Sequence, residues 1–140
     1  IDFYFDLGAE RVTLSDLQGV ADEQETAEVF QAVLSKRNRS QAERIGYHPH
    51  HVSAAKAVAN SSVAYDAGIR CFDASLGGTG GCVTGAPGNQ PVDLLVRSFE
   101  RRRIRTGINR EAVSALTAFA QRELFNKIPL AHHPLRNSYR

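Results

Sequence analysis

The chain has 140 residues, of which 42% are hydrophobic and 23% are charged, and it has a formal net charge of +2. This length and composition predict a soluble globular domain or part of one, and so small a charge gives no reason to expect nucleic acid or a membrane surface as a partner. No apolar run approaches the roughly 20 residues that a transmembrane helix needs. Because the sequence begins at Ile1 and lacks methionine, we expect a piece of a longer protein.

The first third of the chain predicts a strand followed by a helix. Residues 1–8 have the pattern of a helix end, and residues 11–16 have that of a strand whose apolar face ends at Asp16. This carboxylate either finds a partner at the strand end or caps the turn that follows. A capping box precedes a helix predicted over 23–36, and the polar residues 36–44 are expected to form an exposed connection.

The second strand, predicted over 44–50, contains two imidazoles. His48 and His50 stand two residues apart, so both side chains point to the same side of the sheet. Pro49 between them has no N–H to donate to a neighbouring strand, which favours a place at the end of a strand. We therefore expect the two imidazoles at the carboxyl end of this strand, with His51 directed away from them or already in the turn.

A helix over 53–67, ended by Gly68, and a third strand over 69–75 come next. The helix is expected to bury a narrow stripe of small residues, namely Ala55, Val58, Ala59 and Val63. Residues 77–90 contain six glycines and one proline, which predicts a loop without regular structure. Two helices, one from Pro91 onward and one over 110–124, and an irregular tail over 128–140 complete the chain.

Four arginines stand near the end of the helix that begins at Pro91: Arg101, Arg102, Arg103 and Arg105. Cations at a helix C-terminus are favourable by roughly 0.3–1 kcal/mol each when exposed, which accounts for these arginines without a ligand. Because this helix leads away from the carboxyl ends of the strands, we expect the cluster at the far end of the fold. We predict that mutating these arginines changes solubility or stability more than substrate affinity.

The alternation of strand and helix predicts parallel strands with helices packed outside them. The three strand ends, at Asp16, His50 and Ser75, then lie on one rim of the sheet, where parallel α/β folds build their sites. A complete eightfold barrel needs about 250 residues, so three β/α units and an extra helix make roughly three-eighths of one. The predicted fold class is α/β, part of a TIM (β/α)8 barrel over residues 1–127, with open sheet edges that seek a partner.

Two imidazoles on one rim make half of a metal site. Oxygen atoms of Asp16, Asp73 and the amide of Asn89 could reach the same space, and such a mixed set suits Mg²⁺, Mn²⁺ or Zn²⁺ without choosing among them. Cys82, framed by glycines, can transfer a proton if its surroundings lower the pKa of the thiol. Ordinary core or surface histidines, and a thiol that only fills space, are the alternative explanation.

Three stretches around the glycine-rich loop form a specific pattern: Phe72-Asp-Ala-Ser-Leu-Gly-Gly-Thr-Gly-Gly-Cys82, Gly88-Asn89 and Asp93-Leu-Leu-Val96. They resemble the cysteine-loop signature of the hydroxymethylglutaryl-CoA lyase family. The strand ends Thr13-Leu-Ser-Asp16 and His48-x-His50 fall where that family has them, and Arg105-Thr-Gly-Ile-Asn109 resembles the segment after its eighth helix. The resemblance extends over nearly the whole chain, and the cysteine loop is its most specific part.

The resemblance implies the last three strand–helix units of a TIM barrel and a metal-assisted cleavage of a 3-hydroxy-3-methylglutaryl thioester to acetyl-CoA and acetoacetate. His48, His50 and Asn89 would ligate Mg²⁺ or Mn²⁺. Cys82 would be the acid/base of the loop, and Asp16 would help to position the substrate or metal-bound oxygens.

The sequence departs from the family in three places. The Arg-Asp pair of the family's first strand has no counterpart here, His51 stands where the family has Asp, and Val83 stands where it has Pro. The pattern His-x-His-His, followed by Val58-Ala-Asn-Ser61, is also similar to 4-hydroxy-2-oxovalerate aldolases of the same superfamily, although these lack the Gly-Gly-Cys loop. An aldolase of this type and a truncated, non-catalytic barrel remnant are therefore the alternatives.

The partners that these hypotheses imply are a small acyl-CoA or hydroxy-keto acid substrate and either a second copy of the chain or the missing half of a barrel. The 140 residues alone are not expected to assemble the full metal shell, so we expect the isolated piece to be inactive. Two cysteines beside an α/β pattern favour free thiols in a reducing compartment. We expect the cytoplasm or the mitochondrial matrix.

Overall fold

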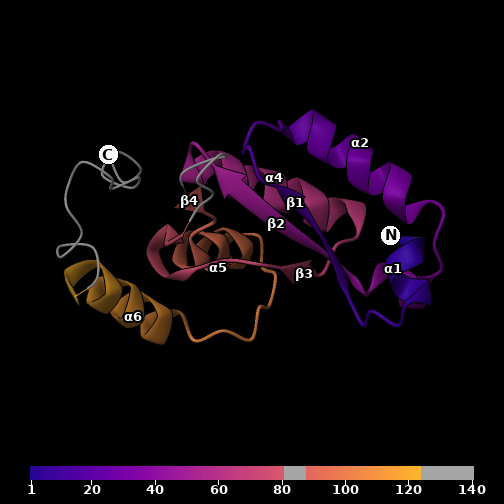
Figure 1. The fold of residues 1–140 in the computed structure, drawn as a ribbon. Coiled ribbons are helices and arrows are strands. Elements are labelled where there is room, and N and C mark those ends of the chain that lie inside the picture. The colour runs from indigo at the N-terminus through magenta and orange to yellow at the C-terminus, as the bar shows by residue number, and fades with distance from the viewer. Residues whose placement is uncertain (81–87, 124–140) are drawn as a thin grey trace.

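The computed structural model describes residues 1–80 and 88–123, which form a parallel sheet with helices packed against one of its faces (Figure 1). The sheet consists of β1 (Val12–Asp16), β2 (Ile45–His51) and β3 (Cys71–Phe72), in that order and all parallel. The predicted order and direction of the three strands are thereby confirmed. A fourth short strand, β4 (Gly88–Asn89), pairs antiparallel with the end of β2.

The helices are α1 (Asp2–Asp6), α2 (Glu23–Leu34), α3 (Arg39–Ala42), α4 (Ala54–Ala67), α5 (Val92–Arg101) and α6 (Arg110–Glu123), with one 3₁₀ turn, η1 (Leu76–Gly78). The capping box predicted for α2 is present, because Asp22 accepts from the Glu25 backbone at 2.8 Å and Glu25 accepts from the Asp22 backbone at 3.0 Å. Within the described residues no helix is both long and apolar enough to cross a membrane. The expected tail over 128–140 lies outside them.

Two segments for which no helix or strand was expected contain short elements. The connection over 36–44 contains α3, where Asn38 and Gln41 cap each other's backbone N–H groups and so stabilise a single turn. The glycine-rich segment contains η1 and β4, because residues of β2 pair with Gly88 and Asn89. The expectation of a loop without regular structure was therefore wrong at both ends of that segment.

The core lies between the sheet and the helices. Its main cluster is formed by Phe30 of α2, Ile45 and Tyr47 of β2, Ala64 of α4 and Ile69 before β3. Of the predicted stripe of α4, Val58 is buried, whereas Ala55, Ala59 and Val63 are not. The buried residues of α4 are Ala54, Ala57, Val58, Asn60, Ser61 and Ala64. Small residues line most of this helix, so the apolar pattern alone did not fix which side faces the sheet.

The opposite face of the sheet holds the candidate site. In the register of β1 and β2, Ser15 pairs with His48 and Asp16 pairs with Pro49. Since paired residues of neighbouring strands point to the same side, Ser15 and His48 lie on the face away from the helices. Figure 1 shows α4 behind β1 and β2, with the site face toward the viewer.

Candidate metal centre

The two imidazoles meet at the end of β2, as the two-residue spacing predicts. The Nε2 atoms of His48 and His50 lie 3.0 Å apart, and their ring centroids are 4.9 Å apart. Only one hydrogen can lie between two neutral imidazole nitrogens, so at least one Nε2 presents a lone pair to the other. Two such nitrogens facing each other could hold a cation once the shared hydrogen is displaced.

The second nitrogen of His48 is held by a carboxylate. Its Nδ1 atom lies 3.2 Å from Oδ2 of Asp73, which follows β3. An ionised carboxylate can only accept a hydrogen bond, so Nδ1 of His48 donates to Asp73 and its Nε2 is left as the acceptor. This contact was not predicted, although Asp73 had been considered as an oxygen ligand; the register of β2 and β3 places it directly beside His48.

Asn89 reaches the same place from β4. It stands directly opposite His50 in the antiparallel pair, so the two side chains share one face. Its Nδ2 atom donates to the carbonyl of Thr79 at 2.8 Å, which fixes the amide. Its Oδ1 atom is buried and has no hydrogen-bond partner in the described part of the chain. Leaving a buried acceptor unpaired costs roughly 1–3 kcal/mol, so a bound cation or hydrogen-bond donor at this oxygen would be favourable.

A cavity of about 380 Å³ opens beside these atoms, lined by His48, Phe72, Asp73, Ala74, Ser75 and Asn89. Across residues 1–80 and 88–123, no group of three or more His, Cys, Asp or Glu side chains is arranged to hold a metal ion. The candidate donors in the described residues are two imidazole nitrogens and one amide oxygen. Such a set fits a divalent cation that keeps open positions for a substrate or water.

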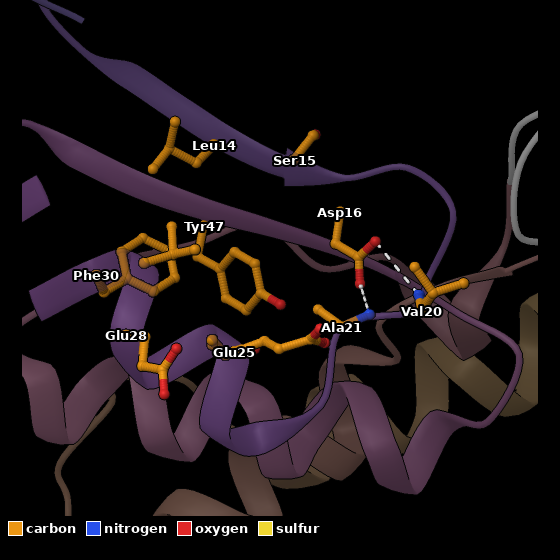
Figure 2. A pocket seen from close by; sticks show the side chains of 11 residues that line it. Leu14, Ser15, Asp16, Val20, Ala21, Glu25, Glu28, Phe30 and Tyr47 are labelled. Carbon is orange, nitrogen blue, oxygen red and sulfur yellow. Dashed lines mark hydrogen bonds between the residues drawn. The ribbon is translucent and has the colours of Figure 1, made fainter. Parts of the chain in front are cut away.

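Asp16 lies on the other face of the sheet. Its carboxylate accepts hydrogen bonds from the backbone of Val20 at 3.3 Å and of Ala21 at 3.1 Å (Figure 2). It therefore caps the turn after β1, which is one of the two roles that the sequence left open. The structure brings together His48, His50 and Asn89 but records no contact between them and Asp16 among the described residues.

A second cavity, of about 490 Å³, lies between β1 and α2 on the helix-facing side (Figure 2). Asp16 and Tyr47 line it, together with Thr26 of α2. The hydroxyl of Tyr47 is buried and makes no hydrogen bond within the described ranges, and the same is true of the Thr26 hydroxyl. Burial raises the pKa of Tyr47, and the charge of Asp16 adds to that rise, while Thr26 and Asn60 partly offset it.

His51 is the third imidazole of the strand. It lies on the helix-facing side of the sheet and is only 2% exposed. Neither of its ring nitrogens makes a hydrogen bond in the part of the chain that the structure describes. Burial lowers the pKa of His51; the nearby Asn89 backbone raises it in part and His50 lowers it further. His51 is therefore neutral at neutral pH. It points away from His48 and His50, which is one of the two positions that the sequence predicted for it.

Cys82, the candidate acid/base, lies outside the described residues, within 81–87. Among the described residues that flank this range, Ser75, which precedes η1, and Asn89 of β4 line the cavity. Its role remains a prediction from the sequence.

The sequence and the fold both match proteins of known activity. Residues 2–119 match the protein family described as HMGL-like. The chain is 29% identical to hydroxymethylglutaryl-CoA lyase YngG of Bacillus subtilis over 127 residues, which are 89% of this chain and 41% of that protein. It is 32% identical to 4-hydroxy-2-oxovalerate aldolase 6 of Rhodococcus jostii over 125 residues, which are 89% of this chain and 33% of the aldolase.

Among solved structures, the HMG-CoA lyase of Acinetobacter baumannii in complex with coenzyme A and 3-methylmalate matches the fold with a TM-score of 0.74. The identity is 31%, and the match covers 87% of this chain and 39% of that one. HMG-CoA lyases are TIM barrels, so the predicted fold, part of a TIM barrel, is confirmed. The chain spans between 33% and 41% of the length of these three proteins.

Proposed function

Because this chain belongs to the HMGL-like family, we propose that it supplies part of the active site of a divalent-metal-dependent carbon–carbon lyase. The proposed reaction is the cleavage of a 3-hydroxy-3-methylglutaryl thioester to acetyl-CoA and acetoacetate. The names of the B. subtilis relative and of the A. baumannii structure support this choice, and the latter was solved with coenzyme A bound. The substrate class that follows is a small acyl-CoA.

The observation on which the proposal depends is a pair of facing imidazole nitrogens with an unpaired amide oxygen on the neighbouring strand. The two Nε2 atoms of His48 and His50 face each other at 3.0 Å, and the amide of Asn89, opposite His50, has a buried Oδ1 without a hydrogen-bond partner in the described part of the chain. A purely structural pair of histidines does not account for that unpaired oxygen. A cation held by all three atoms does.

Each residue has a separate task in this proposal. His48 and His50 would hold the cation through Nε2, and Asn89 would hold it through Oδ1. Bound Mg²⁺ or Mn²⁺ supplies Lewis-acid stabilisation of the negative charge that develops on substrate oxygens. Cleavage of a carbon–carbon bond beside a hydroxyl also requires that a proton leaves the hydroxyl and that one reaches the departing carbon. The Cys82 thiol is assigned to proton transfer on the grounds of its position in the sequence.

Asp16 has an indirect part in the proposal. Through its hydrogen bonds to Val20 and Ala21, it fixes the turn that follows β1 at the same rim of the sheet as the two imidazoles. A fixed turn at this rim would help to position the substrate. The carboxylate would then act through the backbone and not by touching the reacting atoms.

An aldolase that cleaves a 4-hydroxy-2-oxo acid is the second candidate, because the R. jostii aldolase is 32% identical to this chain. The two reactions release different products, acetoacetate from the lyase and pyruvate from the aldolase. Product analysis with both substrates, on the protein that contains this chain, separates them. A non-catalytic remnant of a barrel would release neither product.

Metal binding by the protein that contains this chain tests the proposal most directly. Calorimetric titration with Mn²⁺ should show saturable binding at one site, and His48→Ala or His50→Ala should weaken it by more than roughly 10-fold, since each removes a proposed ligand. His51→Gln is the matched control, because it changes the third imidazole of the same strand on the opposite face; its affinity should stay within about 2-fold. The proposal is contradicted if the folded protein that contains this chain binds no Mn²⁺, or binds it equally well without His48 and His50.

A further inference from the structure

We propose that Asp73 is a positioning residue that sets the tautomer and the orientation of His48 for metal binding, an inference that rests on the metal site proposed above. Asp73 lies on the same face of the sheet as His48 and on the neighbouring strand end. Its Oδ2 atom is 3.2 Å from Nδ1 of His48, the ring nitrogen that does not face His50. Asp73 would not touch the cation.

The backbone of Asp73 is fixed from two sides. Its N–H donates to the carbonyl of Tyr47 at 2.9 Å, which extends the ladder between β2 and β3 by one residue. Its carbonyl accepts from Nε2 of Gln90 at 3.3 Å, and Gln90 is fully buried. Gln90 is itself held, since its backbone N–H donates to the Pro49 carbonyl at 3.3 Å. The carboxylate therefore projects from an anchored point toward His48.

The position of one hydrogen decides whether His48 can bind a cation. With the hydrogen on Nδ1, donated to Asp73, Nε2 of His48 keeps a lone pair that points toward Nε2 of His50. With the hydrogen on Nε2, that lone pair is lost and a cation cannot bind there. Metal-bound histidines commonly donate their other ring N–H to a carboxylate, which fixes the ring and makes the ligating nitrogen more basic. The contact between His48 and Asp73 has this arrangement.

A direct role for Asp73 as a ligand is the competing possibility. The geometry opposes it, because Oδ2 is engaged at Nδ1, and Nδ1 and Nε2 lie on different edges of the imidazole ring. A carboxylate bound to Nδ1 lies on the side of His48 that is turned away from His50 and hence from the point where the donors converge. The two possibilities differ in what happens to the tautomer of His48 when the carboxylate is removed.

The test is nuclear magnetic resonance of the metal-free chain with ¹⁵N-labelled histidine, followed by titration with Mn²⁺. Wild-type His48 should carry its hydrogen on Nδ1. Asp73→Ala should shift His48 toward the Nε2–H form and weaken Mn²⁺ binding by about 10–100-fold. Asp73→Asn should give a smaller loss, because the amide oxygen can still accept from Nδ1.

Asp66→Asn is the matched control. Asp66 is also an ion-paired carboxylate of similar exposure, 60% against 56% for Asp73, but it pairs with Arg102 on α5. This variant should change neither the tautomer nor the affinity. The inference is overturned if wild-type His48 has its hydrogen on Nε2, or if Asp73→Ala weakens Mn²⁺ binding without altering the tautomer, as a ligand would. A wild-type chain with the Nδ1–H form that binds no Mn²⁺ refutes the metal site alone.

Discussion

At the scale of single residues, the candidate site depends on close approaches that leave no room for extra atoms. The amide of Asn89 lies against Gly80, and a Cβ built on Gly80 would meet Nδ2 of Asn89 at 2.5 Å. Gly80 also has a φ of +89°, which L-residues rarely adopt. Glycine is thus favoured at position 80 for two reasons: the backbone conformation there, and the space that the Asn89 amide occupies.

Gly80→Ala should therefore weaken Mn²⁺ binding more than it weakens the fold, because the methyl group displaces the Asn89 amide. Gly8→Ala is the matched control, since Gly8 has the same φ of +89° but open space around its Cβ position. Both variants should lose a similar amount of stability, on the order of 1 kcal/mol from backbone strain. Calorimetric titration should show a drop in Mn²⁺ affinity of 10-fold or more for Gly80→Ala alone. Equal Mn²⁺ affinities of the two variants would mean that Asn89 is not a ligand.

Tyr47 gives a prediction about stability and pH. Its ring packs edge-on against Phe30, with centroids 5.0 Å apart, while its buried hydroxyl makes no hydrogen bond in the described ranges. Tyr47→Phe keeps the ring and removes only that hydroxyl, so chemical denaturation at neutral pH should show a change within about 1 kcal/mol. A loss above about 2 kcal/mol would mean that the hydroxyl has a partner.

The alkaline limit should also change in this variant. Burial raises the pKa of Tyr47 in the folded chain above its ordinary value near 10. Above pH of about 10, the unfolded chain loses this proton while the folded chain retains it, so the free energy of unfolding falls as the pH rises toward the folded-state pKa. Tyr47→Phe should lack that part of the decline, and denaturation curves between neutral pH and pH of about 11 measure the difference.

At the scale of elements, the parallel register of β1, β2 and β3 decides what can meet. It places His48 beside Asp73 and leaves Asp16 beside Pro49 on the face toward the helices. The short strand β4 then adds Asn89 from the opposite direction. The site is thus assembled by three chain segments that end at one rim, and a shift of one residue in any pairing would turn its side chains to the other face.

The arginines after α5 act between elements. Arg102 donates to Oδ1 of Asp66 at 2.5 Å and to the carbonyl of Ser62 at 3.2 Å, so it joins the end of α5 to α4. The sequence accounted for this cluster by its place at a helix end alone. The structure therefore adds a second role for Arg102, which is to hold the end of α5 against α4.

Arg102→Ala should lower the free energy of unfolding by about 0.5–1 kcal/mol, because the ion pair is partly exposed and screened. Arg101→Ala, an exposed neighbour, should lower it by less than about 0.5 kcal/mol. Neither change should alter Mn²⁺ affinity, because α5 begins at Val92, which bonds to Ser75 beside the cavity, and its ten residues extend over about 15 Å to Arg101. Urea denaturation and Mn²⁺ titration of both variants check this, and a loss of affinity in Arg102→Ala would contradict it.

At the scale of the whole molecule, the sheet has one covered face and one open face. The helices cover the side of Ile45 and Tyr47, whereas Thr13 and Ser15 of β1 are exposed on the side of the imidazoles. In a closed barrel, side chains on that second face are surrounded by the remaining strands. This arrangement agrees with a chain that spans 33–41% of its relatives, and we propose that further β/α units, or a second copy of the chain, close the site.

The sequence by itself determined what depends on near neighbours along the chain. The alternation of strands and helices, the capping box of α2, the end of α4 at Gly68 and the common side of His48 and His50 all follow from patterns of two to four residues. The resemblance to a known family identified the fold class from the same residues. These features do not require knowledge of which strands are paired.

Only the tertiary structure decided what depends on contacts between distant segments. The side of α4 that faces the sheet, the place of Asp16 away from the imidazoles and the hydrogen bond from His48 to Asp73 are all set by packing and strand register. A residue's own pattern shows which neighbours share its face, but not which strand lies beside it or at what offset. In this fold, Leu14, Tyr47 and Phe72 stand side by side on three strands and pack in one core, and these three residues are far apart in the sequence.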